Sequence, residues 1–211
     1  MNRLNFLIEW YHKENERRTS LNNSLNIPIG ILTGLFALIF FLIKEFDFEN
    51  EINNWIYYSF ILFLIISIIF WLLVVFNLFR SYNKLFKGYE YDGLPFATQL
   101  DEQYKGLETY VEQYRDLLDK DITPDSLYEE QLIAMLSEYI NTNVDNNDTK
   151  SEYLHIAKQF LFGCIISIII CTIPFIINFL EHKDKIHKVQ LENIESVNDK
   201  IETINVNNLK I

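Results

Sequence analysis

The chain has 211 residues, of which 49% are hydrophobic and 22% charged, and its formal net charge is -11. Its mean hydropathy of +0.03 averages two extremes, because residues 19–43, 52–79 and 159–180 contain no Asp, Glu, Lys or Arg. These stretches of 25, 28 and 22 residues match or exceed the roughly 20 residues that an α-helix needs to cross a bilayer. The pattern excludes an ordinary soluble enzyme, a disulfide-stabilised secreted domain and a disordered chain. It predicts an all-α integral membrane protein with three transmembrane helices and a cytoplasmic helical hairpin insert.

Residues 1–24 are predicted to form a short amphipathic helix. The apolar side chains of Leu4, Leu7, Ile8 and Tyr11 recur at spacings of three and four, with charged residues between and after them. Such a helix buries its apolar face, and we expect that face to lie at the membrane surface before the chain enters the bilayer.

Residues 25–79 are predicted to form a transmembrane hairpin. Pro28 lies near the start of the first helix, where a missing amide hydrogen costs least. Gly30 and Gly34 share one face of this helix, and small residues at this spacing let another helix approach closely, within the subunit or between subunits. A short acidic connection precedes Trp55, the first aromatic residue of the second span.

Residues 80–158 form the only sizeable polar region between spans and hold 8 basic and 16 acidic residues. Apolar residues in its first half follow a rhythm of four and three, which predicts an amphipathic helix with a seam for partner helices. We expect this seam to join subunits: Leu100, Tyr104, Leu107, Val111, Tyr114 and Leu118. Thr123 then caps a second helix that starts at Pro124 and packs back as a hairpin. Residues 141–150, rich in Asn and Asp, are compatible with a loop or with a helix that continues into the third span.

The distribution of Lys and Arg predicts which side of the membrane each segment occupies. Residues 159–180 form the third span and residues 181–211 a helical tail, so the N-terminus and residues 80–158 share one side. That side holds 12 basic residues and the other side 6. Because cytoplasmic segments retain basic residues, we expect the N-terminus and residues 80–158 to be cytoplasmic.

The chain carries no sequence motif of a familiar catalytic or cofactor site. The Walker loop, nucleophile elbow, zinc-protease and dinucleotide fingerprints are absent from the sequence. Asp145, Asn147 and Thr149 alternate as calcium ligands do, but the glycine and the final glutamate of a calcium loop are missing. We therefore expect no enzyme activity, no cofactor and no bound metal.

Three basic residues follow the second span on one helix face: Arg80, Lys84 and Lys87. They serve either as an anchor to anionic lipid or as a contact for a phosphate-bearing ligand. Residues 88–96 then end the helix with two glycines and a proline, and include Tyr89 and Tyr91. These tyrosines either wall a ligand pocket or lie at an interface without any ligand.

The spans contain hydroxyl and amide side chains but no charge, whereas transporters and proton pumps usually place ionisable groups within the membrane. Coupled transport is therefore disfavoured. A helical oligomer with a mostly apolar, gated pore is compatible with the sequence, with Thr33, Ser67 and Asn77 lining it. Hydrogen bonds between packed helices account for the same residues equally well.

The stretch SLNNSLNIPIGILT at residues 20–33 and the stretch DTKSEYLHIAK at residues 148–158 carry a family resemblance. They resemble small bacterial three-span membrane effectors of anti-phage defence, in particular the channel effector of Hailong systems. That family has the same order of amphipathic start, two-span hairpin, helical cytoplasmic insert and final span. The resemblance implies a homo-oligomeric ion channel in the bacterial inner membrane, a partner nucleotidyltransferase, and an oligonucleotide or nucleotide signal.

Two hypotheses of function follow. The first is an oligomeric membrane effector whose cytoplasmic region binds an anionic signal and thereby gates an ion-conducting pore. Its predicted ligand contacts are Arg80, Lys84, Lys87, Tyr89 and Tyr91. The alternative is a non-conducting membrane adaptor that anchors a cytosolic partner through the acidic hairpin.

Overall fold

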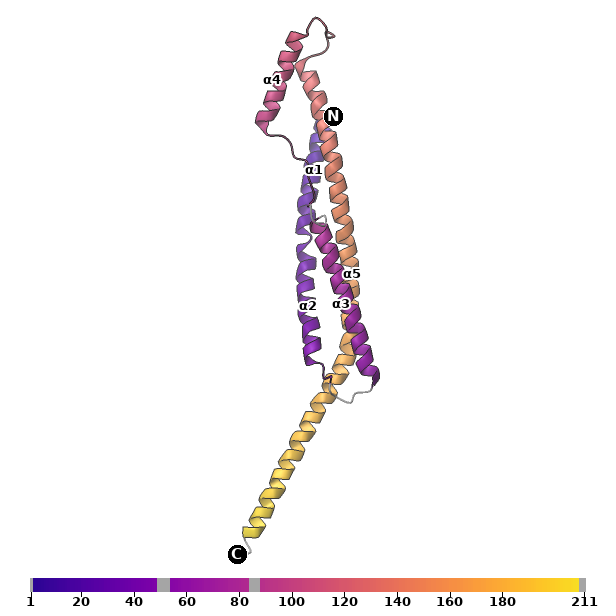
Figure 1. Cartoon of the computed structure of the whole chain (residues 1–211), viewed down its shortest axis with the longest axis vertical. Coiled ribbons are helices and arrows are strands. Elements are labelled where there is room, and N and C mark those ends of the chain that lie inside the picture. The colour runs from indigo at the N-terminus through magenta and orange to yellow at the C-terminus, as the bar shows by residue number, and fades with distance from the viewer. Residues whose placement is uncertain (1, 49–53, 84–87, 209–211) are drawn as a thin grey trace. The chain divides into compact units, whose positions relative to one another are not determined.

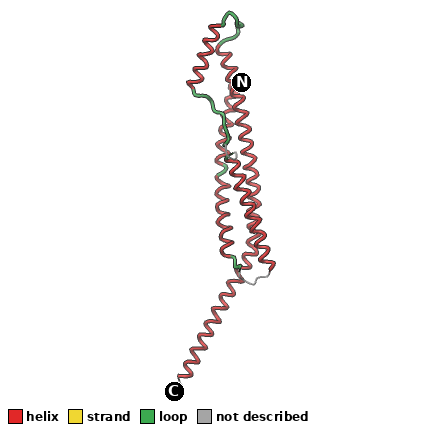
Figure 2. The backbone as a smooth tube through the Cα atoms, viewed as in Figure 1, coloured by secondary structure: helices red, strands yellow, loops and turns green. Residues whose placement is uncertain are grey.

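The computed structural model describes residues 2–48, 54–83 and 88–208, with side chains described as far as residue 181. Figures 1 and 2 show helices joined by loops, and no strand occurs within these residues. The helices are α1 (Arg3–Asn23), α2 (Asn26–Glu45), α3 (Asn54–Tyr82), α4 (Ala97–Gln113) and α5 (Pro124–Asn208). The predicted all-α class is therefore confirmed.

Among the described residues, three helical stretches are long and apolar enough to cross a membrane. They are Arg3–Glu45, which joins α1 and α2, Asn54–Tyr82, which is α3, and Pro124–Glu181, which is most of α5. The three apolar stretches of the sequence lie in these helices. The chain is thus a multi-pass membrane protein by helix length and composition.

The helix starts follow local capping rules. Asn2 accepts a hydrogen bond from Leu4 N–H through its side chain, at 3.3 Å, and so caps α1. The hydroxyl of Thr123 accepts from Ser126 N–H at 3.1 Å, and Pro124 occupies the first turn of α5. The predicted cap and proline start of this helix are confirmed. Of the two alternatives for residues 141–150, a loop or a continuous helix, the structure shows the helix, since α5 runs through them without a break.

The structure divides into two compact units. One comprises Met1–Ile29 and Val75–Lys158 and is called the polar unit; the other comprises Gly30–Val74 and Gln159–Ile211 and is called the apolar unit. The helices α2, α3 and α5 contribute residues to both units. The N-terminal helix and the region after the second span therefore belong to one unit, although the sequence suggested separate parts.

The apolar unit is built on a cluster of buried side chains from α2, α3, α5 and the segment after α2. The cluster consists of Ile39, Leu42, Phe46, Phe60, Leu64, Cys164, Ile168, Cys171 and Phe175. The rings of Phe46 and Phe60 are parallel, with centroids 3.8 Å apart. A Cβ added at Gly163 would lie 3.3 Å from the ring of Phe70, so this glycine lets α5 approach α3 closely.

The polar unit has a smaller apolar core, in which Leu7 and Tyr11 of α1 pack against Leu136 and Ile140 of α5. This packing corrects the expectation that the apolar face of residues 1–24 lies on the membrane. An amphipathic helix buries that face against whichever apolar surface it meets, and α5 supplies one within the chain. Of the four residues that predicted the face, Ile8 stays exposed.

Candidate functional site

The three asparagines of α5 at 143, 146 and 147 are turned into the polar unit. Their spacing places them on one helix face, and Asn143 and Asn147 are fully buried. Asn143 accepts from Asp92 N–H and donates to the Asp92 carbonyl, both at 3.1 Å. Asn146 donates to the Glu90 carbonyl at 2.6 Å. These amides hold residues 88–96, here called the strap, against α5.

The strap is an extended loop between α3 and α4 (Figure 2). It starts at Gly88, whose φ of 71° lies in the left-handed region that favours glycine. Tyr11 of α1 fixes it further along, since its hydroxyl accepts from Leu94 N–H at 3.2 Å and donates to the Asp92 carbonyl at 3.4 Å. The strap is therefore held by hydrogen bonds to both α5 and α1.

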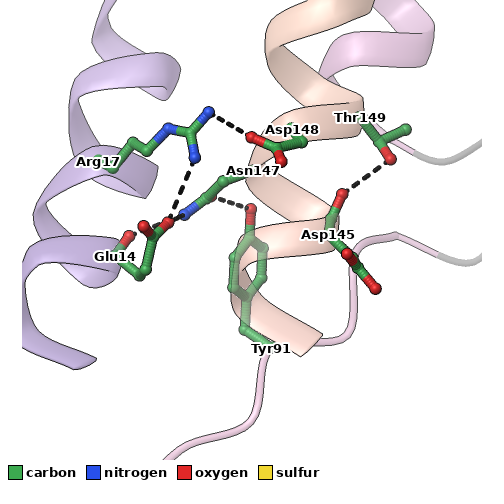
Figure 3. Close-up of polar contacts among 7 residues, drawn as sticks. All are labelled: Glu14, Arg17, Tyr91, Asp145, Asn147, Asp148 and Thr149. Atoms are coloured by element: carbon green, nitrogen blue, oxygen red, sulfur yellow. Dashed lines mark hydrogen bonds and ion pairs between the residues drawn. The ribbon is translucent and has the colours of Figure 1, made fainter. Parts of the chain in front are cut away.

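Asn147 joins α1, the strap and α5 (Figure 3). Its amide nitrogen donates to the carbonyl and to the carboxylate of Glu14, each at 2.9 Å, and its oxygen accepts from the Tyr91 hydroxyl at 2.8 Å. Arg17 lies 3.5 Å from the Glu14 carboxylate and 2.5 Å from that of Asp148. The hydrogen bond to Asp148 raises the pKa of Arg17. The guanidinium of Arg17 thus forms an ion pair with each of the two carboxylates.

Lys150, one turn beyond Asn147, is 4% exposed, yet its ammonium has no carboxylate partner within 4 Å among the described residues. Its Nζ donates to the Asn22 side-chain oxygen at 2.7 Å. It also lies 5.2 Å from the ring centroid of Tyr89 and 5.7 Å from that of Tyr91. Burial, and to a lesser extent the charge of Arg18, lowers the pKa of Lys150.

Two arginines are held in the same way, on tyrosine rings rather than on carboxylates. The guanidinium of Arg18 lies 4.0 Å from the centroid of Tyr91, and that of Arg80 lies 4.0 Å from the centroid of Tyr153, whose hydroxyl accepts its hydrogen bond. Tyr89 donates to the Arg80 carbonyl at 3.0 Å. Burial raises the pKa of Tyr89 to about 12, so its ring carries no negative charge at neutral pH.

These six side chains are called the cation–tyrosine cluster: Arg18, Arg80, Lys150, Tyr89, Tyr91 and Tyr153. Tyrosine faces attract cations through their quadrupole but do not neutralise them. Three positive charges without ion pairs among the described residues are suited to an anion. Cationic donors make their strongest hydrogen bonds to phosphate or carboxylate oxygens. Chemically, the cluster fits the binding of an anionic ligand and offers no nucleophile beside a base.

The sequence analysis found half of this cluster. The structure brings together Arg80, Tyr89 and Tyr91, whereas Lys84 and Lys87 lie outside the described residues. The sequence did not predict the other three members, Arg18, Lys150 and Tyr153. A signal existed for Lys150, because it continues at helical spacing the polar face that starts at Asn143 and Asn147.

The three residues expected to line a pore lie in different settings. Ser67 is fully buried, and its hydroxyl bonds with the Phe63 carbonyl and with the Ser167 hydroxyl, both at 2.8 Å. It therefore joins α3 to α5 inside the apolar unit. Thr33 is exposed on α2, and Asn77 is buried in the polar unit. The structure gives Ser67 the helix-packing role that the sequence had left as an alternative.

The residues expected at an oligomer interface also divide. A Cβ added at Gly30 or Gly34 would meet nothing within 4 Å, so this face of α2 is open within the chain. The predicted helix is shorter in the structure, because α4 ends at Gln113 and so excludes Tyr114, which is 39% exposed, and the partly buried Leu118. Within α4, Val111 is buried and Leu100 and Leu107 are partly buried. Tyr104 donates to Asp125 at 2.8 Å and meets the ring of Tyr128. At this position the seam is used within the chain.

Within the residues whose side chains the structure describes, no three His, Cys, Asp or Glu side chains are grouped closely enough to hold a metal ion. Comparisons of the chain with protein-family models, with curated proteins and with solved structures give no match.

Proposed function

We propose that the protein is an oligomeric effector of the bacterial inner membrane that forms a gated ion channel under the control of an anionic signal. In this proposal the N-terminus and the polar unit are cytoplasmic, and the signal binds at the cation–tyrosine cluster. The observation that carries the proposal is the buried ammonium of Lys150, which lacks a carboxylate partner among the described residues. A desolvated charge without a counter-ion destabilises the folded state, so a function in anion binding accounts for its presence.

A short oligonucleotide is the anion that fits the cluster best. Guanidinium and ammonium groups bind phosphates, and tyrosine rings stack on exposed bases. A partner nucleotidyltransferase would supply such a ligand, as the family resemblance implies, and the chain would act in anti-phage defence.

The helices offer a route from ligand to pore. Arg80 and Ser81 belong to the last turns of α3, and Lys150 and Tyr153 belong to α5. The Ser81 hydroxyl donates to the Lys150 carbonyl at 2.9 Å, so the two helices are tied at this point. Both helices also contain the apolar stretches of the spans. A ligand that changes how the cluster is held would therefore bias the packing of α3 against α5.

Ion flux through liposomes that contain the full chain tests the proposal. We expect flux through the wild-type protein to change when a short single-stranded DNA is added, and the half-maximal DNA concentration to rise about tenfold for Lys150→Met, equivalent to roughly 1.4 kcal/mol. Lys105→Met is the matched control, since Lys105 is an exposed lysine that pairs with Asp101. Its response should equal that of the wild type.

Liposomes that stay impermeable with and without DNA would contradict the channel. The absorbance of the protein sample must first show that no nucleic acid was co-purified, because a bound inhibitor also gives silence. Impermeable liposomes with a nucleic-acid-free protein would leave the membrane adaptor as the better account. Equal DNA responses of Lys150→Met and Lys105→Met would remove the cluster from the mechanism.

A further inference from the structure

The helix α1 presents an aromatic groove on a face that it does not use against α5. Phe6 and Trp10 are 48% and 39% exposed, and their rings meet edge to face with centroids 5.7 Å apart. Together with Glu9 and Lys13 they line a groove of about 510 Å³. Leu7 and Tyr11, one position further along the helix, are the residues buried in the polar unit. The groove is therefore an open apolar surface beside a packed one.

A second exposed apolar surface lies at the end of α4. Tyr110, Tyr114 and Leu117 follow a spacing of four and three and are 46%, 39% and 82% exposed. The ring centroids of Tyr110 and Tyr114 are 5.0 Å apart, and these two side chains together with the exposed Leu117 are called the ridge. Nearly the whole side chain of this leucine is in contact with solvent. A ridge of this kind is a typical interaction surface, because aromatic side chains supply much of the binding energy at protein interfaces.

The two helices that carry these surfaces have opposite net charges. The groove belongs to α1, which has four basic and three acidic residues, whereas α4 has one basic and four acidic residues. Lys13 at the rim of the groove is exposed and lies 3.3 Å from Glu9 of the same helix, and Glu112 and Asp116 beside the ridge are exposed as well. Opposite charges at the rim of an apolar contact favour association and fix its orientation.

We propose that the ridge of one copy of the chain docks in the groove of a second copy. This inference rests on the proposed oligomeric effector and names the contact that assembles it. The contact joins two different surfaces, so each copy offers one free groove and one free ridge. Repetition of such a contact gives a closed ring when the rotation between neighbours permits closure. Of the predicted seam, only Tyr114 takes part in this ridge, and Tyr110 and Leu117 lie outside the seam.

A second copy fits this groove better than the membrane surface does. The residues that α1 packs against, Leu136 and Ile140, precede the apolar stretch of α5 at residue 159 by roughly five to six helical turns. The groove also has an acidic residue, Glu9, in its lining. Anionic headgroups favour surfaces that carry basic residues alone.

The mass of the purified full chain in detergent, measured by light scattering, tests the contact with two variants. Trp10→Ala removes a wall of the groove, and Leu117→Glu places a charge on the ridge. We expect each variant to lose the multi-chain mass of the wild type. An equal mixture of the two should give particles of two chains and no larger, since one intact ridge and one intact groove remain. Leu94→Glu is the matched control, because Leu94 is an exposed leucine outside the ridge.

A cross-link in native membranes gives a second readout that does not depend on detergent. Chains carrying Lys13→Cys and chains carrying Asp116→Cys, produced together, should form a disulfide-linked pair on mild oxidation. Neither chain alone should do so. The native thiols of Cys164 and Cys171 are buried and do not compete.

Wild-type mass in both Trp10→Ala and Leu117→Glu, without a cross-link, would overturn the docking contact. If those variants also conducted ions like the wild type, the effector proposal would stand and only the docking contact would fail. The groove would then be assigned to lipid binding. A wild-type chain that is monomeric and impermeable would overturn the effector proposal together with the contact.

Discussion

Asn143 and Asn178 of α5 make the same pair of hydrogen bonds in two different regions of the molecule. Each side chain is fully buried. Asn143 binds the N–H and carbonyl of Asp92, both at 3.1 Å, and Asn178 binds the N–H and carbonyl of Asp47, both at 3.0 Å. In both regions a side-chain amide satisfies the main-chain N–H and carbonyl of a non-helical segment, as a neighbouring strand would do in a β-sheet.

The surroundings of the two amides differ. Asn143 is one of several grips on the strap, which Asn146, Asn147 and Tyr11 also bind. Asn178 serves the segment after α2 in the apolar unit, where the neighbouring Phe46 stacks on Phe60 and belongs to the apolar core. If the Asn143 hydrogen bonds are lost, other side chains of the polar unit still hold the strap. The Asn178 hydrogen bonds in the apolar unit lie next to apolar core residues instead. The comparison teaches that the polar unit is suited to rearrange, whereas the apolar unit is suited to stay fixed.

Asn178→Leu should give the largest loss of stability. The change removes the Asn178 amide from the N–H and carbonyl of the half-buried Asp47, next to Phe46 of the apolar core, which costs about 3 kcal/mol. Thermal unfolding of the detergent-solubilised protein measures the loss. Thr172→Val on the same helix is the control, since its hydroxyl bonds only the carbonyl of Ile169. A loss no greater than that of the control would remove the assigned role of Asn178.

Asn143→Leu should cost about half as much, roughly 1.5 kcal/mol. The strap keeps its contacts with Asn146, Asn147 and Tyr11, which hold it against α5 and α1 when Asn143 is removed. Hydrogen exchange at the amides of Asp92 and Leu94 should accelerate, because both belong to the strap. Equal losses for Asn143→Leu and Asn178→Leu would break the comparison, since they would show that the strap has no substitute grips.

Lys150→Met should change stability in the opposite direction. Methionine keeps the apolar stem and removes a buried charge, so we expect a gain of about 1 kcal/mol at pH 7. The pH dependence has a defined sign. Because the pKa of Lys150 is lower in the folded state than in the unfolded chain, the folded state binds fewer protons as pH approaches the ordinary lysine value, and wild-type stability should rise with pH there.

The control for this prediction is Lys105→Met, which removes an exposed lysine whose pKa its hydrogen bond to Asp101 raises. The loss of Lys105 should not account for the rise of stability with pH, so the Lys105→Met protein, which keeps Lys150, should still show that rise. Melting temperatures of the three proteins between pH 7 and pH 10 provide the measurement. A Lys150→Met protein that melts below the wild type would show that the ammonium stabilises the fold, and the argument for an anion site from its burial would fail.

The sequence predicted the helices well because their signals are local. Hydrophobic runs, Thr123 with Pro124 and the rhythm of α4 each lie within one segment. The cation–tyrosine cluster was only half predicted, since it joins residues from α1, the strap and α5, such as Arg18, Tyr91 and Lys150. The pairing of these segments depends on the asparagine face of α5, and many of its partners are main-chain groups, which leave no trace in the pattern of side chains.

Gly163 shows the same limit in the apolar unit. The spacing of Gly30 and Gly34 predicts a close approach of another helix, yet a Cβ added at either glycine would have no neighbour within 4 Å. The close approach of helices occurs instead at Gly163, opposite Phe70. One glycine in an apolar helix gives no periodic signal, so only the structure identifies it.

Ser67→Ala should have the smallest effect, a loss of about 0.6 kcal/mol, the average for hydrogen bonds between membrane helices. The loss is small because Ser167 keeps its second bond, to the Phe63 carbonyl at 3.2 Å. Thermal unfolding of Ser67→Ala, Ser167→Ala and the double variant isolates the coupling between the two hydroxyls. The same variants decide between packing and pore lining, because a hydroxyl that lines a pore alters ion flux when it is removed. A changed flux with unchanged stability would return Ser67 to the pore and show that the apolar unit is not the fixed part of the molecule.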